Sequence, residues 1–140
     1  MRGMVRAGRK HPAVRLAALA LVGNLAGKDW RGEIETLHAY VRDDVRYVRD
    51  IRGVETLQTP ELTLELGQGD CDDKSILLAS LLETIGHPSR FVAVGYGPLG
   101  YQHVFTQTLN GHRWLSMETT EPVPVGWMPR HPERAMIQHV

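Results

Sequence analysis

Three side chains that could form a thiol-based catalytic site follow one another along the chain. Cys71, the only cysteine, lies in the segment Gly69–Lys74, where a glycine-containing turn leads into an expected helix. His103 lies at the expected start of a strand, and Glu118 lies at the expected end of the next strand. A thiolate attacks a carbonyl carbon, an imidazole carries the thiol proton, and a carboxylate fixes the imidazole tautomer. The three residues therefore predict a Cys–His–Glu site for acyl transfer.

The helix expected from Cys71 has consistent sequence features at both ends. Asp70 is the expected N-cap, Asp73 lies three residues later in an acidic first turn, and Gly86 favours a left-handed exit. Apolar residues at helical spacing form a stripe between these ends. The free amides at a helix start favour a thiolate, whereas Asp72 and Asp73 disfavour it. We therefore expect an imidazolium beside the thiol.

A predicted hairpin brings the other two residues together. Asn110-Gly111 favours a two-residue type I′ turn, which places Leu109 opposite His112. Counting back along both strands then places His103 opposite Glu118. Directly opposed residues project from one face with β-carbons about 5 Å apart, so a carboxylate there can accept a hydrogen bond from the imidazole.

The remaining elements are expected to support this arrangement. Phe105, Leu109 and Trp114 share the face of His103, so we expect that face to pack against the helix that carries the cysteine. Periodicity, capping residues and branched side chains predict further elements. They are helices at about 12–26 and 32–45, a short helix from Thr59, strands at 46–50 and 90–96, and a polar connector at 51–58.

The composition describes a single domain without a charged face. The chain has 140 residues, with 16 basic and 16 acidic side chains and 42% hydrophobic residues, which suits one core. Because the charges are interspersed beyond a basic N-terminal tail, we expect no nucleic-acid partner. Residues 14–26 could indicate a secretion signal, but Arg15 interrupts them and they are too few to span a membrane. A lone cysteine fits the cytoplasm, so we expect a cytoplasmic protein without membrane contact.

Several sequence blocks resemble the transglutaminase-like superfamily of cysteine enzymes. Gly69-Asp70-Cys71 opens a leucine-rich helix that ends in Ile85-Gly86-His87-Pro88, and His103-Val104 follows. Trp114 then precedes an acidic residue and a threonine. The resemblance spans about 34–120 and is similar to the short versions found in tailed phages and prophages. It implies an α+β fold, the papain-like transglutaminase core, with N-terminal helices and a nucleophile-bearing helix packed on an antiparallel β-sheet.

The resemblance also implies domain boundaries and residue roles. A basic tail and support helix would occupy 1–30, the core 31–121, and an irregular C-terminal strap 122–140, within a single domain. By resemblance, Cys71 is the nucleophile, His103 the acid/base and Glu118 the orienting acid. The family usually has aspartate followed by proline and threonine at the third position, whereas this chain has Glu118-Thr119-Thr120. Glu121 is therefore a competing candidate for the orienting acid.

The expected activity is cysteine-dependent acyl transfer without a cofactor. It would hydrolyse a peptide, isopeptide or amide bond of a protein or peptide substrate through a thioester. The backbone amide of Cys71 is the expected first oxyanion donor, and the second is Gln58 or Gln68. The alternative is a catalytically silent binding or assembly module, associated with a phage particle. Oligomeric state is left open.

Other polar residues are expected to have structural roles. Asp70, Asp72 and Asp73 are consecutive or nearly consecutive acids at a helix start, a place where such acids serve the helix dipole. We therefore expect no metal site. The remaining histidines match no part of the predicted triad and are expected at the surface or in packing; they include His38, His87, His112, His131 and His139.

Overall fold

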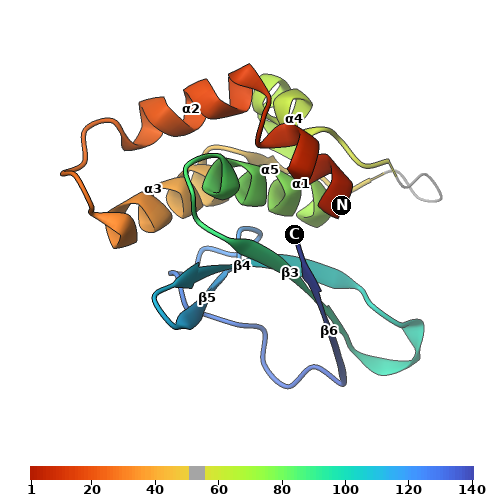
Figure 1. Cartoon of the computed structure of the whole chain (residues 1–140). Coiled ribbons are helices and arrows are strands. Elements are labelled where there is room, and N and C mark those ends of the chain that lie inside the picture. Colours follow the sequence, from red (N-terminus) through yellow and green to blue (C-terminus); the bar gives the residue numbers. More distant parts are fainter. Residues whose placement is uncertain (51–55) are drawn as a thin grey trace.

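The protein is described by a computed structural model that covers residues 1–50 and 56–140. Part of the expected connector at 51–58 lies outside these described residues. Figure 1 shows helices stacked on one face of an antiparallel sheet, which is the expected α+β arrangement. Within the described part of the chain, none of the helices is long and apolar enough to cross a membrane.

The helical layer surrounds one central helix. Its members are α1 (Arg2–Gly8), α2 (Pro12–Val22), α3 (Trp30–Asp43), α4 (Pro60–Leu66) and α5 (Cys71–Thr84). The other four helices all contact α5, and the sheet covers its remaining side. Residues 73–82 of α5 are consequently buried without a break, although the sequence predicts only an apolar stripe. Burial on all sides explains this, because a surrounded helix has no solvent face.

The sheet has four antiparallel strands in the order β5-β4-β3-β6. They are β3 (Ser89–Gly95), β4 (His103–Asn110), β5 (Arg113–Met117) and β6 (Arg134–His139). A separate two-stranded parallel pair joins β1 (Arg46–Tyr47) to β2 (Gln68–Gly69). A short 3-10 turn, Gly97–Leu99, follows β3.

Both termini are more regular than the sequence indicates. Residues expected to be a basic tail form α1, whose Val5 is fully buried against Ile76 and Ala79 of α5. The C-terminal segment, expected to be irregular, ends in β6, which pairs with β3. Every residue of β6 is exposed, so its strand pairing rests on backbone hydrogen bonds and leaves no alternating apolar pattern to detect.

The hairpin register differs from the prediction by two residues. Leu109 pairs with Trp114 and Asn110 with Arg113, so the central turn residues are Gly111 and His112. Only Gly111 has a positive φ, 65°, as in a type II′ turn. Because side chains alternate with a period of two, a shift of two residues keeps every side chain on its expected face.

The prediction of which face meets α5 is wrong. Val104 packs with Ile76 of α5, and the Thr106 hydroxyl donates to the carbonyl oxygen of Ser75 at 3.1 Å. Phe105 lies on the opposite face, where it packs with residues of β3. His103 shares the face of Phe105. Because it is the first residue of β4, it lies at the end of the strand, where it can reach the start of α5.

Candidate active site

The helix that carries Cys71 begins with a closed set of capping hydrogen bonds. Asp70 Oδ1 accepts from the Asp73 amide at 3.0 Å, and Asp73 Oδ2 accepts from the Asp70 amide at 3.1 Å. Asp73 Oδ1 also accepts from the Gln58 amide at 2.8 Å. A Cβ on Gly69 would lie 2.6 Å from the Cβ of Asp73, so this approach requires glycine. The cap fixes the half-exposed Cys71 at the first position of α5.

His103 bridges the thiol and a carboxylate. Its Nε2 lies 2.5 Å from Glu118 Oε2. Its ring lines the same cavity as Cys71, and interaction with the Cys71 side chain helps to raise the pKa of His103. Because Nε2 faces Glu118, Nδ1 is the nitrogen that remains for the thiol. The structure therefore brings together the three residues that the sequence singles out.

Glu118 is buried, and its carboxylate accepts hydrogen bonds from several donors. It follows β5 directly, and 1% of the residue is exposed. Its Oε1 accepts from the Thr119 amide at 3.0 Å, the Thr120 amide at 3.0 Å and the Thr120 hydroxyl at 2.9 Å. Glu121, the competing candidate, is exposed and makes no hydrogen bond to His103 among the described residues.

The electrostatics favour a charged His103–Glu118 pair. Burial acts to lower the pKa of His103, but hydrogen bonds to Cys71 and Glu118 outweigh burial and raise this pKa to about 10. Burial likewise acts to raise the pKa of Glu118, but the hydrogen bond from His103 and the Thr120 donors outweigh it, so the pKa lies below its usual range. An imidazolium beside a carboxylate is thus the stable form near neutral pH.

Two hollows meet at His103. A cavity of about 210 Å³ contains Cys71, and a second of about 400 Å³ lies beside Glu118. Both are lined by Gln102 and His103, so the imidazole borders two candidate substrate hollows. The second hollow has aromatic walls, which come from Tyr47, Tyr96 and Trp127.

The two predicted oxyanion donors lie outside the cavity that contains Cys71. Gln58 uses its backbone amide for Asp73, and its Oε1 accepts from the Thr63 hydroxyl at 3.3 Å. Gln68 lies in β2 and pairs with Arg46. A role for either side chain in the oxyanion hole remains a prediction.

His38 contacts Glu118, although its sequence position indicates no part in the site. His38 lies on α3 with 1% of its surface exposed, and its Nε2 lies 2.6 Å from the main-chain oxygen of Glu118. The apolar face of α3, formed by Ile34, Leu37 and Val41, contains this one imidazole. A histidine on an apolar helix face needs a buried hydrogen-bond partner, and that requirement was the available sign.

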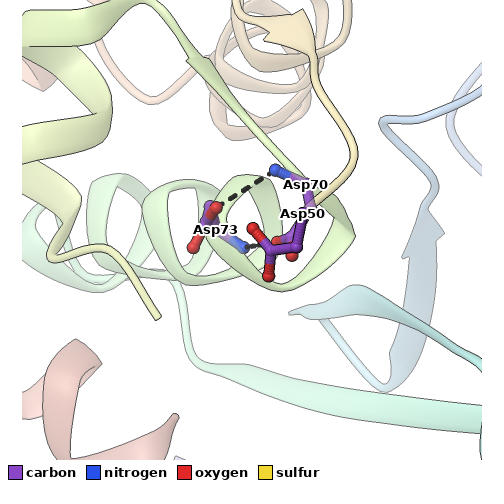
Figure 2. Close-up of side chains that lie close together, drawn as sticks. All are labelled: Asp50, Asp70 and Asp73. Carbon is purple, nitrogen blue, oxygen red and sulfur yellow. Dashed lines mark hydrogen bonds between the residues drawn. The ribbon is translucent and has the colours of Figure 1, made fainter. Parts of the chain in front are cut away.

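Three carboxylates gather at the same helix start (Figure 2). One oxygen from each of Asp50, Asp70 and Asp73 lies within 4.8 Å of the others. A hydrogen bond between the first two carboxyl groups raises the pKa of Asp50, and burial is the main cause that raises the pKa of Asp70. Asp50 comes from the segment after β1, far from the other two along the chain, so the sequence does not indicate its place in this cluster. Carboxylate oxygens are the ligands that hard cations such as Ca²⁺ prefer.

Comparisons with solved structures show the same fold at low sequence identity. A "putative protease" from Parabacteroides distasonis matches 87% of this chain with 13% identity and a TM-score of 0.68. A "putative cysteine protease" from Cytophaga hutchinsonii matches 91% with 12% identity and a TM-score of 0.63. Calcium-bound LapG from Legionella pneumophila matches 99% with 16% identity and a TM-score of 0.65.

The matched regions differ in how much of each structure they represent. The chain spans 26% of the Parabacteroides protein, 50% of the Cytophaga protein and 86% of LapG. None of the curated proteins matches the chain significantly in sequence. The family model of the transglutaminase-like superfamily matches residues 20–119, which contain the nucleophile helix and the hairpin with His103 and Glu118. The chain belongs to the transglutaminase-like superfamily.

Proposed function

We propose that this chain is a cysteine peptidase or amidase in which Cys71, His103 and Glu118 form the catalytic triad. The supporting observation is that His103 shares a cavity with Cys71 and hydrogen-bonds through Nε2 to the buried carboxylate of Glu118. In this arrangement the imidazole can hold the thiol proton and later deliver it, while the carboxylate stabilises the imidazolium.

The chemistry follows from these positions. The Cys71 thiolate attacks the carbonyl carbon, and the Cys71 backbone amide at the helix start donates to the developing oxyanion. His103 then gives its Nδ1 proton to the leaving amine, the C–N bond breaks, and a thioester remains. Water attacks the thioester while His103 accepts one of the water's protons. The C–S bond breaks and the carboxylic acid is released. The Cys71 thiolate and the His103 imidazolium then form the starting ion pair again.

Hydrolysis of a protein or peptide is favoured over transfer to a second amine. The two hollows beside His103 are of modest size, which favours water over a second bound amine as the acyl acceptor. The structural neighbours described as proteases support a protein substrate. Isopeptide and amide bonds share the same reacting group and belong to the same proposal.

The test combines thiol reactivity with turnover. Iodoacetamide should alkylate Cys71 at neutral pH faster than a free thiol, and His103→Ala should abolish the advantage. A library of internally quenched peptides should be cleaved by the wild type and not by Cys71→Ala. Slow alkylation that is indifferent to His103, with no cleavage, would instead favour a binding or assembly module on the same fold.

We also propose that the cluster of Asp50, Asp70 and Asp73 binds a divalent cation, with Ca²⁺ as the best fit. One oxygen from each carboxyl group lies within 4.8 Å of the others, and the neighbouring Asp70 raises the pKa of Asp50, so a cation among them would offset their mutual repulsion. The calcium-bound state of a structural neighbour supports the choice of ion. A bound cation would fix the helix start directly before the nucleophile.

Calorimetric titration of the EGTA-treated protein with CaCl₂ tests this proposal. We expect saturable binding and a rise in melting temperature, because a ligand that binds only the folded state stabilises it. Asp50→Asn should weaken both effects, whereas Asp44→Asn, an exposed acid at the end of α3, should leave them unchanged. No binding at millimolar calcium, or equal binding by Asp50→Asn, would refute it.

A further inference from the structure

The side chain of His38 connects the helical layer to the end of β5. His38 lies in the middle of α3, and its ring reaches the main-chain oxygen of Glu118 at 2.6 Å. The neighbouring apolar residues of α3 pack in one cluster with Met117, the residue before Glu118. The hydrogen bond therefore sits at a packed junction between α3 and the end of β5.

The direction of this hydrogen bond is fixed by chemistry. A carbonyl oxygen only accepts, so His38 must carry a proton on Nε2. Burial is the main cause that lowers the pKa of His38, which favours the neutral ring with that single proton. His38 thus donates a hydrogen bond across the pH range in which the enzyme chemistry would operate.

The strand pairing of the sheet does not extend to Glu118. The paired region of β5 ends at Met117, opposite Thr106, and Glu118 lies one residue beyond. Apart from the hydrogen bond to His103, its carboxylate is held by Thr119 and Thr120, which are its immediate neighbours in the chain. Among the described residues, His38 supplies the hydrogen bond to its main-chain oxygen from a distant part of the chain.

We infer that His38 is a positioning residue that fixes the Glu118 main chain, and thereby aims the Glu118 carboxylate at His103. Because α3 also packs on α5, the contact ties the acid at the end of β5 to the helical layer that carries Cys71. The catalytic consequence of this role rests on the proposed function. The structural claim does not, since it concerns the hydrogen bond between His103 and Glu118.

The test measures that hydrogen bond directly by NMR. The proton between His103 Nε2 and Glu118 should resonate at low field, because a charge-assisted bond of 2.5 Å is short. His38→Leu removes the donor and keeps an apolar side chain. We expect the low-field proton to move upfield or vanish, and the pKa of His103 to fall by at least one unit from about 10.

His38→Gln and Ile34→Ala are the matched variants. The glutamine amide can donate to the same carbonyl oxygen, so His38→Gln should restore the low-field proton and the His103 pKa. Ile34→Ala removes buried contacts one turn away on α3, and it should lower the melting temperature without changing either NMR readout. Should His38→Leu fail to fold, His38→Asn gives the same comparison, because its shorter amide cannot reach the carbonyl.

The outcomes separate this inference from the proposed function. If peptides are cleaved, His38→Leu should lower kcat about tenfold to a hundredfold with little change in KM, as expected for a misplaced catalytic group. If no peptide is cleaved, the NMR readouts still decide the role of His38. An unchanged proton and an unchanged His103 pKa in His38→Leu, with only a lower melting temperature, would overturn the inference.

Discussion

Nε2 of His103 lies 2.5 Å from Oε2 of Glu118, although the two residues are not paired in the hairpin. In the observed register, Glu118 would continue the ladder opposite Phe105, two residues along β4 from His103. Both positions lie on one face of the sheet, so the carboxylate approaches the imidazole along a diagonal. Glutamate, one methylene longer than aspartate, suits this longer reach.

Glu118→Gln should disable the pair while leaving its shape. An amide oxygen can still accept from His103, but it carries no charge to stabilise the imidazolium. The pKa of His103 should therefore fall from about 10 toward its ordinary value of 6.5, as an NMR titration of the ring would show. We expect kcat to fall about 10²–10⁴-fold, as for loss of the acid in comparable triads.

Glu121→Gln is the control for that experiment. Glu121 is exposed and lies three residues further along, so its substitution should leave the His103 titration and turnover unchanged. A His103 titration that shifts with Glu121→Gln and not with Glu118→Gln would reverse the assignment of the orienting acid.

Local features of the site could be predicted from sequence because their causes are local. Asp70 and Asp73 form the expected capping box, and Thr59 caps the helix that begins at Pro60. Gly86 has the expected positive φ, 95°. Each of these outcomes depends on residues within one turn of one another, so the sequence carries the full information.

Longer-range features were predicted less well. The hairpin register depended on whether Asn110-Gly111 or Gly111-His112 formed the turn centre, and these alternatives differ by a small local preference. The error of two residues preserved the face, so the predicted contact between His103 and Glu118 survived. His38 and Asp50 meet the site only through tertiary packing, so the spacing of residues in the sequence does not predict these contacts.

Thr120→Val should weaken the support of the Glu118 carboxylate. The Thr120 hydroxyl donates to Oε1 at 2.9 Å, and removing it deletes one hydrogen bond to a charged group. We expect a loss of about 1.5–3 kcal/mol in the free energy of unfolding at neutral pH, measured with urea. The pKa of Glu118 should rise, because the Thr120 donors help to lower it.

The acid limb of the stability curve provides a second readout for Thr120. A carboxyl whose pKa is lowered by folding contributes stability above its ordinary value of 4.5, and that stability is lost as pH falls through the folded pKa. The free energy of unfolding of Thr120→Val should therefore fall less steeply from neutral pH to the acid range than that of the wild type. Thr119→Val is the control, since Thr119 contributes a backbone amide that valine retains. Equal curves for both variants would contradict the role of the hydroxyl.

Gly69→Ala should disturb the start of α5. The added Cβ would lie 2.6 Å from Cβ of Asp73, and that side chain is held by two backbone amides and cannot easily move. We expect a destabilisation of about 1–3 kcal/mol. Alkylation of Cys71 should also slow, because the cap places the thiol. Gly3→Ala, in α1 with open space around its Cβ, should be neutral or slightly stabilising, and a similar loss there would contradict the steric argument.

His103 and Lys74 should change the stability of the protein in opposite directions at alkaline pH. The pKa of His103 is raised from 6.5 to about 10, so its contribution to stability is present below 6.5 and is lost as pH rises through about 10. Burial lowers the pKa of Lys74 from 10.5 to about 8, so the unfolded chain binds this proton more tightly between these values. Stability from Lys74 therefore rises with pH over that interval.

Single substitutions should separate the two contributions. Lys74→Met removes the rise, so unfolding free energies measured with urea should fall more steeply from pH 8 to 10 than in the wild type. His103→Ala removes the fall and should leave stability rising over the same interval. Lys74 also donates to the carbonyl oxygen of Val45 at 2.7 Å, so its substitution lowers the whole curve as well as changing the slope. Parallel curves for the three proteins would show that neither group changes its proton affinity on folding.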